Sequence, residues 1–251
     1  MSGVLSGRTI LVTRPRERTR AFVDLLRAQG ATALEAPTIR LEEAPPGGAL
    51  DRAIRAAASG RYSWVVFTSP KTVEVWFARD RALRAGGIAA EVAAIGDGTA
   101  EALRGNGRQP DLVPGAFTTA ALGRAFPRGE GRVLLPRADI APPDLEEALR
   151  AKGWTPVRVT AYRTMVPRSL PADARGALQK SLVDAIVFTS ASTVEGFVRL
   201  AGVVNGPKVV CIGPVTARAA RVAGFRVHAI ARPHTVEGLV SALERVVRGR
   251  V

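Results

Sequence analysis

The sequence has few of the residues that metal and disulfide sites require. Its 251 residues include one cysteine, Cys211, and two histidines, His228 and His234. A single cysteine excludes an internal disulfide and a cysteine-based metal cage, and two histidines are too few for a convincing metal constellation. We interpret Cys211 as a small buried residue, His228 as a strand residue and His234 as a loop residue before a helix.

Long apolar runs and targeting segments are also missing. No apolar stretch approaches the roughly 18 residues that a membrane span requires. The first residues lack the positive region, apolar stretch and small-residue cleavage site of a secretory signal. We therefore expect a cytoplasmic protein with no membrane partner.

Most familiar catalytic motifs are absent. There is no phosphate-binding loop with its lysine, no G-x-S-x-G and no H-E-x-x-H. The stretch from Gly96 to Gly98 opens like a dinucleotide fingerprint, but Glu101 stands where the third glycine belongs, so we interpret it as a tight turn between a strand and a helix. No close pair of carboxylates offers general acid–base chemistry.

The charge is strongly of one sign. The formal net charge is +14 and the pI is near 11.4. Such a surface attracts polyanions, which include nucleic acids, anionic lipids and small substrates with many carboxylates. Arginine far outnumbers lysine, so a compositional bias that leaves a solvated basic surface explains the charge equally well. Both interpretations stay open.

The chain repeats itself. The segment VVFTSPKTVEVWF begins at Val65, and IVFTSASTVEGFV begins at Ile186. Other segments recur at nearly the same spacing. The pairs that mark the repeats are Ser69 and Ser190 (190 − 69 = 121 positions apart), Gly96 and Gly213 (213 − 96 = 117), and Arg14 and Arg137 (137 − 14 = 123). The whole chain is thus an approximate duplication.

Each repeated segment predicts a strand that leads into a helix. The strands are short runs rich in β-branched residues without alternation, as in parallel sheets buried on both faces. Amphipathic stretches follow them, so the pattern predicts βαβ units. We expect an α/β protein of two small doubly wound parallel sheets. Proline-bearing polar segments place the boundaries, with residues 1–40 plus 168–251 in one domain and 41–167 in the other.

Hydroxyls, glycines and cations follow the expected strands, where helices begin. Helix N-termini attract anions, so the set suggests anion recognition, although for any single threonine a helix N-cap is the favoured explanation. These threonines are Thr72, Thr99, Thr193, Thr216 and Thr235. Tyr162 ends a strand at the expected domain crossing. One interpretation is that its ring packs at this crossing while its hydroxyl stays in contact with water. The other is that its hydroxyl binds or protonates a ligand.

Taken together, these motifs resemble the uroporphyrinogen-III synthase family. The resemblance rests on VVFTSPKTVEVWF, AAIGDGTAEAL, VLLPRADIAPPDLEEALRAKGWTPVRVTAYRT, AIVFTSASTVEGF, VCIGPVTARAARVAGF and ARPHTVEGLVSAL, and it covers nearly the entire chain. It implies two flavodoxin-like domains joined by a two-stranded connection. It also implies an enzyme, a lyase of porphyrin and heme biosynthesis, that cyclises hydroxymethylbilane to uroporphyrinogen III with loss of water and inversion of the last pyrrole ring.

The resemblance also assigns roles to residues. Tyr162 matches the tyrosine expected to assist departure of the hydroxyl. Ser69, Lys71, Thr99, Ser190 and Thr216 match substrate-binding positions, and Arg14, Arg137 and Thr235 are further candidates from their places at strand ends. Many members have glycine where this chain has Ala138, which leaves the loop there in question. The family implies a monomer with a polycarboxylate tetrapyrrole substrate and no cofactor or metal, and a transient contact with hydroxymethylbilane synthase.

Two other functions compete with this one. A non-catalytic tetrapyrrole- or polyanion-binding regulatory module would have the same fold. A nucleic-acid binder is suggested by charge alone, and the sequence has neither an aromatic RNA-binding motif nor a recognisable recognition helix. We therefore expect no nucleic-acid partner.

Overall fold

The computed structural model describes residues 3–16 and 19–248, and they form two compact units. Met1–Leu41 and Met165–Val251 make up unit 1, and Glu42–Thr164 make up unit 2. The chain passes from unit 1 into unit 2 within β3 (Arg40–Glu43) and returns within β7 (Thr155–Met165). These two strands are neighbours in one sheet.

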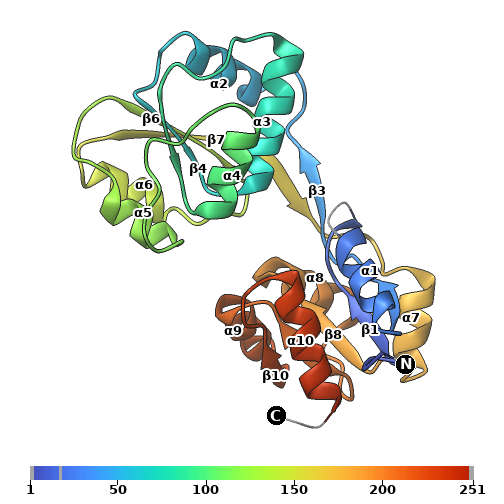
Figure 1. Ribbon diagram of the computed structural model, residues 1–251. Coiled ribbons are helices and arrows are strands. Elements are labelled where there is room, and N and C mark those ends of the chain that lie inside the picture. Colours follow the sequence, from blue (N-terminus) through green and yellow to red (C-terminus); the bar gives the residue numbers. More distant parts are fainter. Residues whose placement is uncertain (1–2, 17–18, 249–251) are drawn as a thin grey trace. The chain divides into compact units, whose positions relative to one another are not determined.

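Unit 1 is a five-stranded parallel sheet between two layers of helices (Figure 1). Its elements are β1 (Thr9–Val12), α1 (Arg20–Ala28), β2 (Thr32–Glu35), α7 (Ala172–Gln179), β8 (Ala185–Phe188), α8 (Ala191–Ala201), β9 (Lys208–Cys211), α9 (Pro214–Val222), β10 (Val227–Ile230) and α10 (Val236–Val247). The strand order is β10-β9-β8-β1-β2, which is the flavodoxin-like order of a doubly wound sheet.

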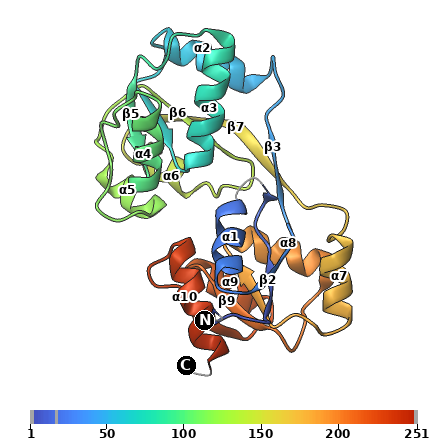
Figure 2. The same ribbon diagram turned by 45° about the vertical axis from the view of Figure 1, so that its right-hand side comes forward.

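The two faces of this sheet are covered by different helices (Figure 2). α1 and α10 pack on one face, where Phe22 and Leu239 belong to the same buried cluster. α7, α8 and α9 lie on the other face, where Phe188 and Phe197 form an edge-to-face pair. Residues of β1 alternate between the two clusters, with Ile10 in one and Leu11 in the other. Burial on both faces explains why these strands have no polar alternation.

Unit 2 has the same layered plan. Besides β3 and β7, its elements are α2 (Ala49–Ala58), β4 (Trp64–Phe67), α3 (Pro70–Leu83), β5 (Glu91–Ala94), α4 (Asp97–Gly105), α5 (Thr119–Ala125), β6 (Arg132–Ala138) and α6 (Asp144–Arg150). The strand order is β3-β7-β6-β4-β5. α5 and α6 cover one face, over a cluster that includes Trp64 and Trp154. On the other face Trp76 of α3 meets the ring of Phe67.

The sequence duplication is also a structural one. The repeats pair β4 with β8, β5 with β9 and β6 with β1, and these strands have matching places in the two sheets. In unit 2 the place of β10 is taken by a single parallel bridge between Ala93 and Leu112. The expected α/β fold of two doubly wound sheets is confirmed.

Candidate active site

The switch points of the two sheets lie between β4 and β6 in unit 2 and between β8 and β1 in unit 1. In doubly wound sheets, ligands bind beyond the carboxyl ends of the strands at such a point. Ser69 follows β4 and Ser190 follows β8, so the duplicated serines occupy these two places. The two serines therefore mark the candidate site in each unit.

Ser69 and Tyr162 come together in unit 2. Ser69 is the N-cap of α3, with extended backbone, and its Oγ accepts a hydrogen bond of 3.1 Å from the backbone N–H of Thr72. The same Oγ lies 2.8 Å from Thr72 Oγ1 and 3.4 Å from the Tyr162 hydroxyl. Tyr162 is 9% exposed. Three hydroxyls from α3 and β7 thus form one cluster at this sheet edge.

A local irregularity accompanies Tyr162. The register of β6 and β7 shifts between Arg137 and Ala138, and Ala138 then stands opposite Tyr162. Such bulges change the direction of side chains at the ends of strands. The loop that follows is held by Arg158, which donates hydrogen bonds to the carbonyls of Ala138, Asp139 and Ala141 at 3.0, 2.8 and 2.8 Å. These three contacts anchor the loop that begins at Ala138.

Most of the candidate threonines lie inside the first helical turn and not at the N-cap that the sequence suggested. Thr72, Thr99, Thr193 and Thr216 lie at the third helical position, and the residues that cap their helices are Ser69, Gly96, Ser190 and Gly213. The N-cap interpretation was wrong for these four because the extended backbone lies three residues earlier. Thr235 does cap α10, since its Oγ1 accepts from the Gly238 N–H at 3.2 Å. Thr99 and Thr216 are 3% and 4% exposed, so little of either is open to a ligand.

Lys71 is engaged by two carboxylates. Its Nζ lies 2.7 Å from Glu74 Oε1 and 3.2 Å from Glu43 Oε1. Burial lowers the pKa of this ammonium, but the hydrogen bonds and charges of Glu74 and Glu43 outweigh burial and raise its pKa above the ordinary value. Lys71 is therefore a firmly charged cation whose charge is already balanced.

Arg137 is a buried residue. It is 2% exposed, and its Nη1 donates to Glu146 Oε2 at 2.7 Å and to the Pro142 carbonyl at 2.9 Å. Its Nε and Glu146 Oε1 have no hydrogen-bond partner, although Arg158 Nη1 lies 3.5 Å from that oxygen. Placement after a strand suggests a substrate-binding cation, but Glu146 and the surrounding core enclose the guanidinium, so this geometry favours a structural role and substrate binding by Arg137 stays a prediction.

In unit 1 the corresponding edge is built around Ser190. Ser190 Oγ accepts from the Thr193 N–H at 3.2 Å, and Thr193 Oγ1 accepts from the Ser190 N–H at 3.2 Å, which is a reciprocal capping box. Thr38, three residues after the end of β2 at Glu35, donates from Oγ1 to the Thr193 carbonyl at 2.8 Å and so ties this turn to the segment that follows β2. Arg14 is half-buried two residues after β1. Arg14, Ser190, Thr216 and Thr235 thus share this edge.

Sequence reasoning missed Phe117. This residue is 57% exposed and its ring lies against Gly96, the cap of α4. One signal was present, because Phe117 and His234 are separated by the same 117 positions (234 − 117) as Gly96 and Gly213. His234 lies against Gly213 in unit 1. The duplication therefore places a ring beside the capping glycine in each unit.

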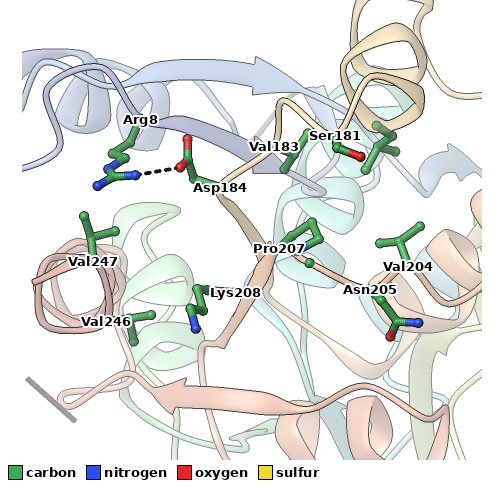
Figure 3. Close-up of a pocket in the computed structure, with 12 residues that line it drawn as sticks. Arg8, Ser181, Val183, Asp184, Val204, Asn205, Pro207, Lys208, Val246 and Val247 are labelled. Carbon is green, nitrogen blue, oxygen red and sulfur yellow. Dashed lines mark hydrogen bonds and ion pairs between the residues drawn. The ribbon is translucent and has the colours of Figure 1, made fainter. Parts of the chain in front are cut away.

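A different hollow opens at the opposite edge of the unit 1 sheet (Figure 3). It has a volume of about 360 Å³, and its walls include Arg8, Asp184, Lys208 and the α10 valines Val246 and Val247. Arg8 Nη1 pairs with Asp184 Oδ1 at 2.9 Å. This hollow lies beside the amino ends of β1, β8 and β9, away from the helix N-termini that follow the strands. We therefore do not assign the catalytic site to it.

The described residues, 3–16 and 19–248, contain no group of three or more histidines, cysteines or acids that could hold a metal ion. Within the same residues, no helix has the length and apolar character needed to cross a membrane. Cys211 is fully buried, and burial raises the pKa of its thiol to about 12. The interpretation of Cys211 as a small buried residue and of His228 as a strand residue of β10 is confirmed.

Comparisons with known proteins agree with one another. A family model described as uroporphyrinogen-III synthase HemD matches residues 20–241. The chain is 33% identical over 260 residues to the uroporphyrinogen-III synthase of Synechococcus elongatus, covering 97% of each protein. It is 31% identical over 261 residues to the porphyrin biosynthesis protein HemD of Ruminiclostridium josui, covering 100% of this chain and 51% of that protein.

The fold has a counterpart among solved structures. The crystal structure of a mutant uroporphyrinogen III synthase from the extremely thermophilic bacterium Thermus thermophilus superposes with a TM-score of 0.72 and 22% sequence identity. The match covers 96% of this chain and 99% of that one. At this level of identity the likeness concerns the fold.

Proposed function

Because the chain belongs to the uroporphyrinogen-III synthase family, we propose that it closes hydroxymethylbilane into uroporphyrinogen III, with loss of water and inversion of the last pyrrole ring. It is an enzyme of porphyrin and heme biosynthesis, and we assign it to the cyclising hydro-lyases, acting without a cofactor. The observation that carries the proposal is the hydroxyl pair of Tyr162 and Ser69, 3.4 Å apart at the switch point of unit 2.

The first step is departure of the hydroxyl group. A pyrrole nitrogen supplies the electron pair that breaks the C–O bond, and the product is a conjugated azafulvene. We assign to the Tyr162 phenol the proton that lets the oxygen leave as water, since a positioned tyrosine hydroxyl is one of the side chains that act as general acids. Ser69 accepts or donates a hydrogen bond at that phenol and so holds its orientation.

The second step decides which isomer forms. The substituted carbon of the last ring attacks the azafulvene, and the resulting spiro intermediate fragments and recloses with that ring inverted. A final proton loss from carbon restores the aromatic pyrrole, and this proton replaces the one that Tyr162 gave to the leaving oxygen. Without an enzyme the unsubstituted carbon attacks and gives the symmetrical isomer. The protein therefore acts mainly by binding one geometry of attack more tightly than the other.

Binding of the acetate and propionate arms is the role we give to the strand ends. The helix N-termini capped by Ser69, Gly96, Ser190 and Gly213 present backbone N–H groups and the positive end of the helix dipole to carboxylates. Thr99 and Thr216 contribute through these first turns, and Arg14, Lys71 and Thr235 add polar or cationic groups nearby. The net charge of +14 favours such a polycarboxylate. We leave Arg137 out because it is only 2% exposed and its guanidinium is enclosed together with Glu146.

The direct test is an isomer analysis. Hydroxymethylbilane is generated in place by hydroxymethylbilane synthase, the protein is added, and the oxidised products are separated into the type I and type III isomers. We expect type III to predominate over the protein-free control. Only type I from protein that is folded by circular dichroism would overturn the proposed activity and leave a binding or regulatory role for the same fold.

A further inference from the structure

We propose that the exposed ring of Phe117 is a platform on which one pyrrole ring of the linear substrate stacks, so that Phe117 helps to select the type III geometry. This inference rests on the proposed function and adds a residue to it. Among the candidate site residues predicted from the sequence, Tyr162 is the one aromatic residue. The case rests on the exposure of Phe117, on its contact with Gly96 and on its place at the sheet edge.

Phe117 is held in an exposed position. It is 57% exposed and directly precedes Thr118, which caps α5 by accepting from the Ala121 N–H at 3.1 Å. Among the strongly exposed large apolar side chains of the described residues, it is the single aromatic one. Leaving a phenyl ring in water forfeits the free energy that its burial would provide. A ligand that covers the ring would recover it.

Gly96 makes room for the ring. A Cβ at this position would lie 2.7 Å from Phe117 Cγ and 2.8 Å from its Cδ1, which is closer than real contacts allow. The backbone of Gly96 is extended, with φ of 178°, a conformation open to any residue. Space for the ring, and not backbone freedom, is therefore what requires glycine at this position.

The ring and the reactive hydroxyl pair share one sheet edge. Gly96 follows β5 and Ser69 follows β4, and these strands are parallel neighbours. A Cβ at Gly98 would lie 3.9 Å from Pro70 Cγ, so the first turns of α4 and α3 approach each other. Pro70 adjoins Ser69, which in turn reaches Tyr162. The Phe117 ring and the Tyr162 hydroxyl therefore lie at the same edge of the unit 2 sheet.

The chemistry of the ring fits a pyrrole. Aromatic side chains prefer stacked or edge-to-face contact with flat π-systems, and hydroxymethylbilane is a chain of four such rings. In unit 1 the matching position carries His234, whose ring atoms come within 3.7 Å of a Cβ built on Gly213. That ring is polar. The apolar face is therefore specific to unit 2, the unit that also holds Tyr162.

The test compares four full-length variants in the isomer assay. Phe117→Ala removes the ring, Phe117→Leu keeps apolar bulk without a flat face, Phe117→Tyr keeps the face, and Gly96→Ala displaces the ring. We expect Phe117→Ala, Phe117→Leu and Gly96→Ala to raise KM by about fivefold to tenfold and to increase the share of type I product. Phe117→Tyr should retain the wild-type KM and isomer ratio.

The outcomes separate this inference from the proposed function. If the wild-type protein forms no type III isomer, the activity itself is refuted. If it does, and Phe117→Leu matches it in KM and isomer ratio, the ring serves only to cover the Gly96 turn and the platform is refuted. Urea unfolding of each variant is measured alongside. Because the ring is mostly exposed, the three Phe117 variants should unfold close to the wild-type midpoint, and a KM change in a fully folded variant supports the platform.

Discussion

Tyr162 on β7 and Ser69 at the start of α3 bring their hydroxyl oxygens within 3.4 Å of each other across 93 positions of the chain. A contact of this length is a weak hydrogen bond. The phenol is thus oriented by its neighbour and can exchange that contact for a shorter one to a ligand. The pair depends on folding, because no local segment of sequence contains both residues.

Replacing Tyr162 with phenylalanine should separate catalysis from folding. We expect Tyr162→Phe to lower kcat by about 100-fold or more, the usual contribution of a positioned general acid. The free energy of unfolding should change by less than about 1 kcal/mol, because the lost hydrogen bond is long. Steady-state turnover and urea unfolding measure the two quantities.

The other tyrosine provides the matched control. Tyr62 is 8% exposed and precedes β4 at the amino end of that strand, with the guanidinium of Arg132 4.9 Å above its ring. Phenylalanine retains that ring face, so Tyr62→Phe should keep wild-type turnover. Equal losses of kcat in both variants would show that the effect of Tyr162→Phe is not specific to the site.

Ser69 combines a structural and a chemical role that two substitutions can distinguish. Ser69→Ala removes the N-cap and should destabilise the protein by about 1 kcal/mol, whereas Ser69→Gly should cost only a few tenths. Glycine already caps the equivalent helices at Gly96 and Gly213. We expect Ser69→Gly to fold normally and to turn over several-fold more slowly, because Tyr162 loses its partner. Wild-type turnover in this variant would remove Ser69 from the site.

The buried pair of Arg137 and Glu146 should matter for stability. Removing one partner of such a pair leaves an uncompensated charge, which typically costs about 3–5 kcal/mol. We expect Arg137→Met to lower the free energy of unfolding in urea by about that amount. Arg8→Met removes a cation whose side chain is 47% exposed, and it should cost no more than about 1 kcal/mol. If Arg137→Met and Arg8→Met lowered the free energy of unfolding by similarly small amounts, the structural role of Arg137 would be contradicted.

His228 should make stability depend on pH. Its Nδ1 accepts the Val209 N–H at 3.0 Å where the register of β9 and β10 shifts, which requires that nitrogen to be unprotonated. Burial and then the charges of Lys208 and Arg226 lower the pKa of His228 below the ordinary 6.5. The unfolded chain therefore binds the proton more readily, and stability falls as pH drops below about 6.5, until the folded-state pKa is passed.

A variant isolates this effect from other titrating groups. Asparagine can offer its side-chain oxygen to the Val209 N–H without taking up a proton, so His228→Asn should keep the contact and weaken the pH dependence. We expect the wild type to lose more stability than His228→Asn between pH values of about 7.5 and 5.5 in urea unfolding. Parallel curves for the two proteins would exclude His228 as the cause.

The fold could be predicted because its signals are local. Parallel strands buried on both faces appear as short β-branched runs, such as the segments that became β4 and β8, and the two copies support each other. The family assignment was confirmed, because the family model matches residues 20–241. The cap positions were harder to predict. A serine or a glycine stands three residues before each of the four threonines at third helical positions, all three residue types occur at N-caps, and only the backbone dihedral angles decide between them.

Two features depend on tertiary contacts and escaped prediction. Arg137 looks like any other cation at a strand end, and only its packing against Glu146 shows that it is enclosed. Phe117 looks like a single aromatic residue in a loop, and only the missing Cβ of Gly96 shows where its ring lies. The roles of Tyr162, Ser69 and the other substrate-binding candidates remain predictions for the experiments above.

The strand order also determines which strands lack a partner while the chain is being synthesised. The ribosome completes β1 and β2 first, yet β1 lies between β2 and β8 in its sheet, and β8 emerges only at Ala185, 173 positions after Val12 (185 − 12). Unit 2 is continuous in the chain and is synthesised in full during that interval. Until β8 arrives, one edge of β1 has no strand to pair with, and exposed edges invite pairing with other chains. We therefore expect nascent chains that stall between the two halves of unit 1 to be prone to aggregation.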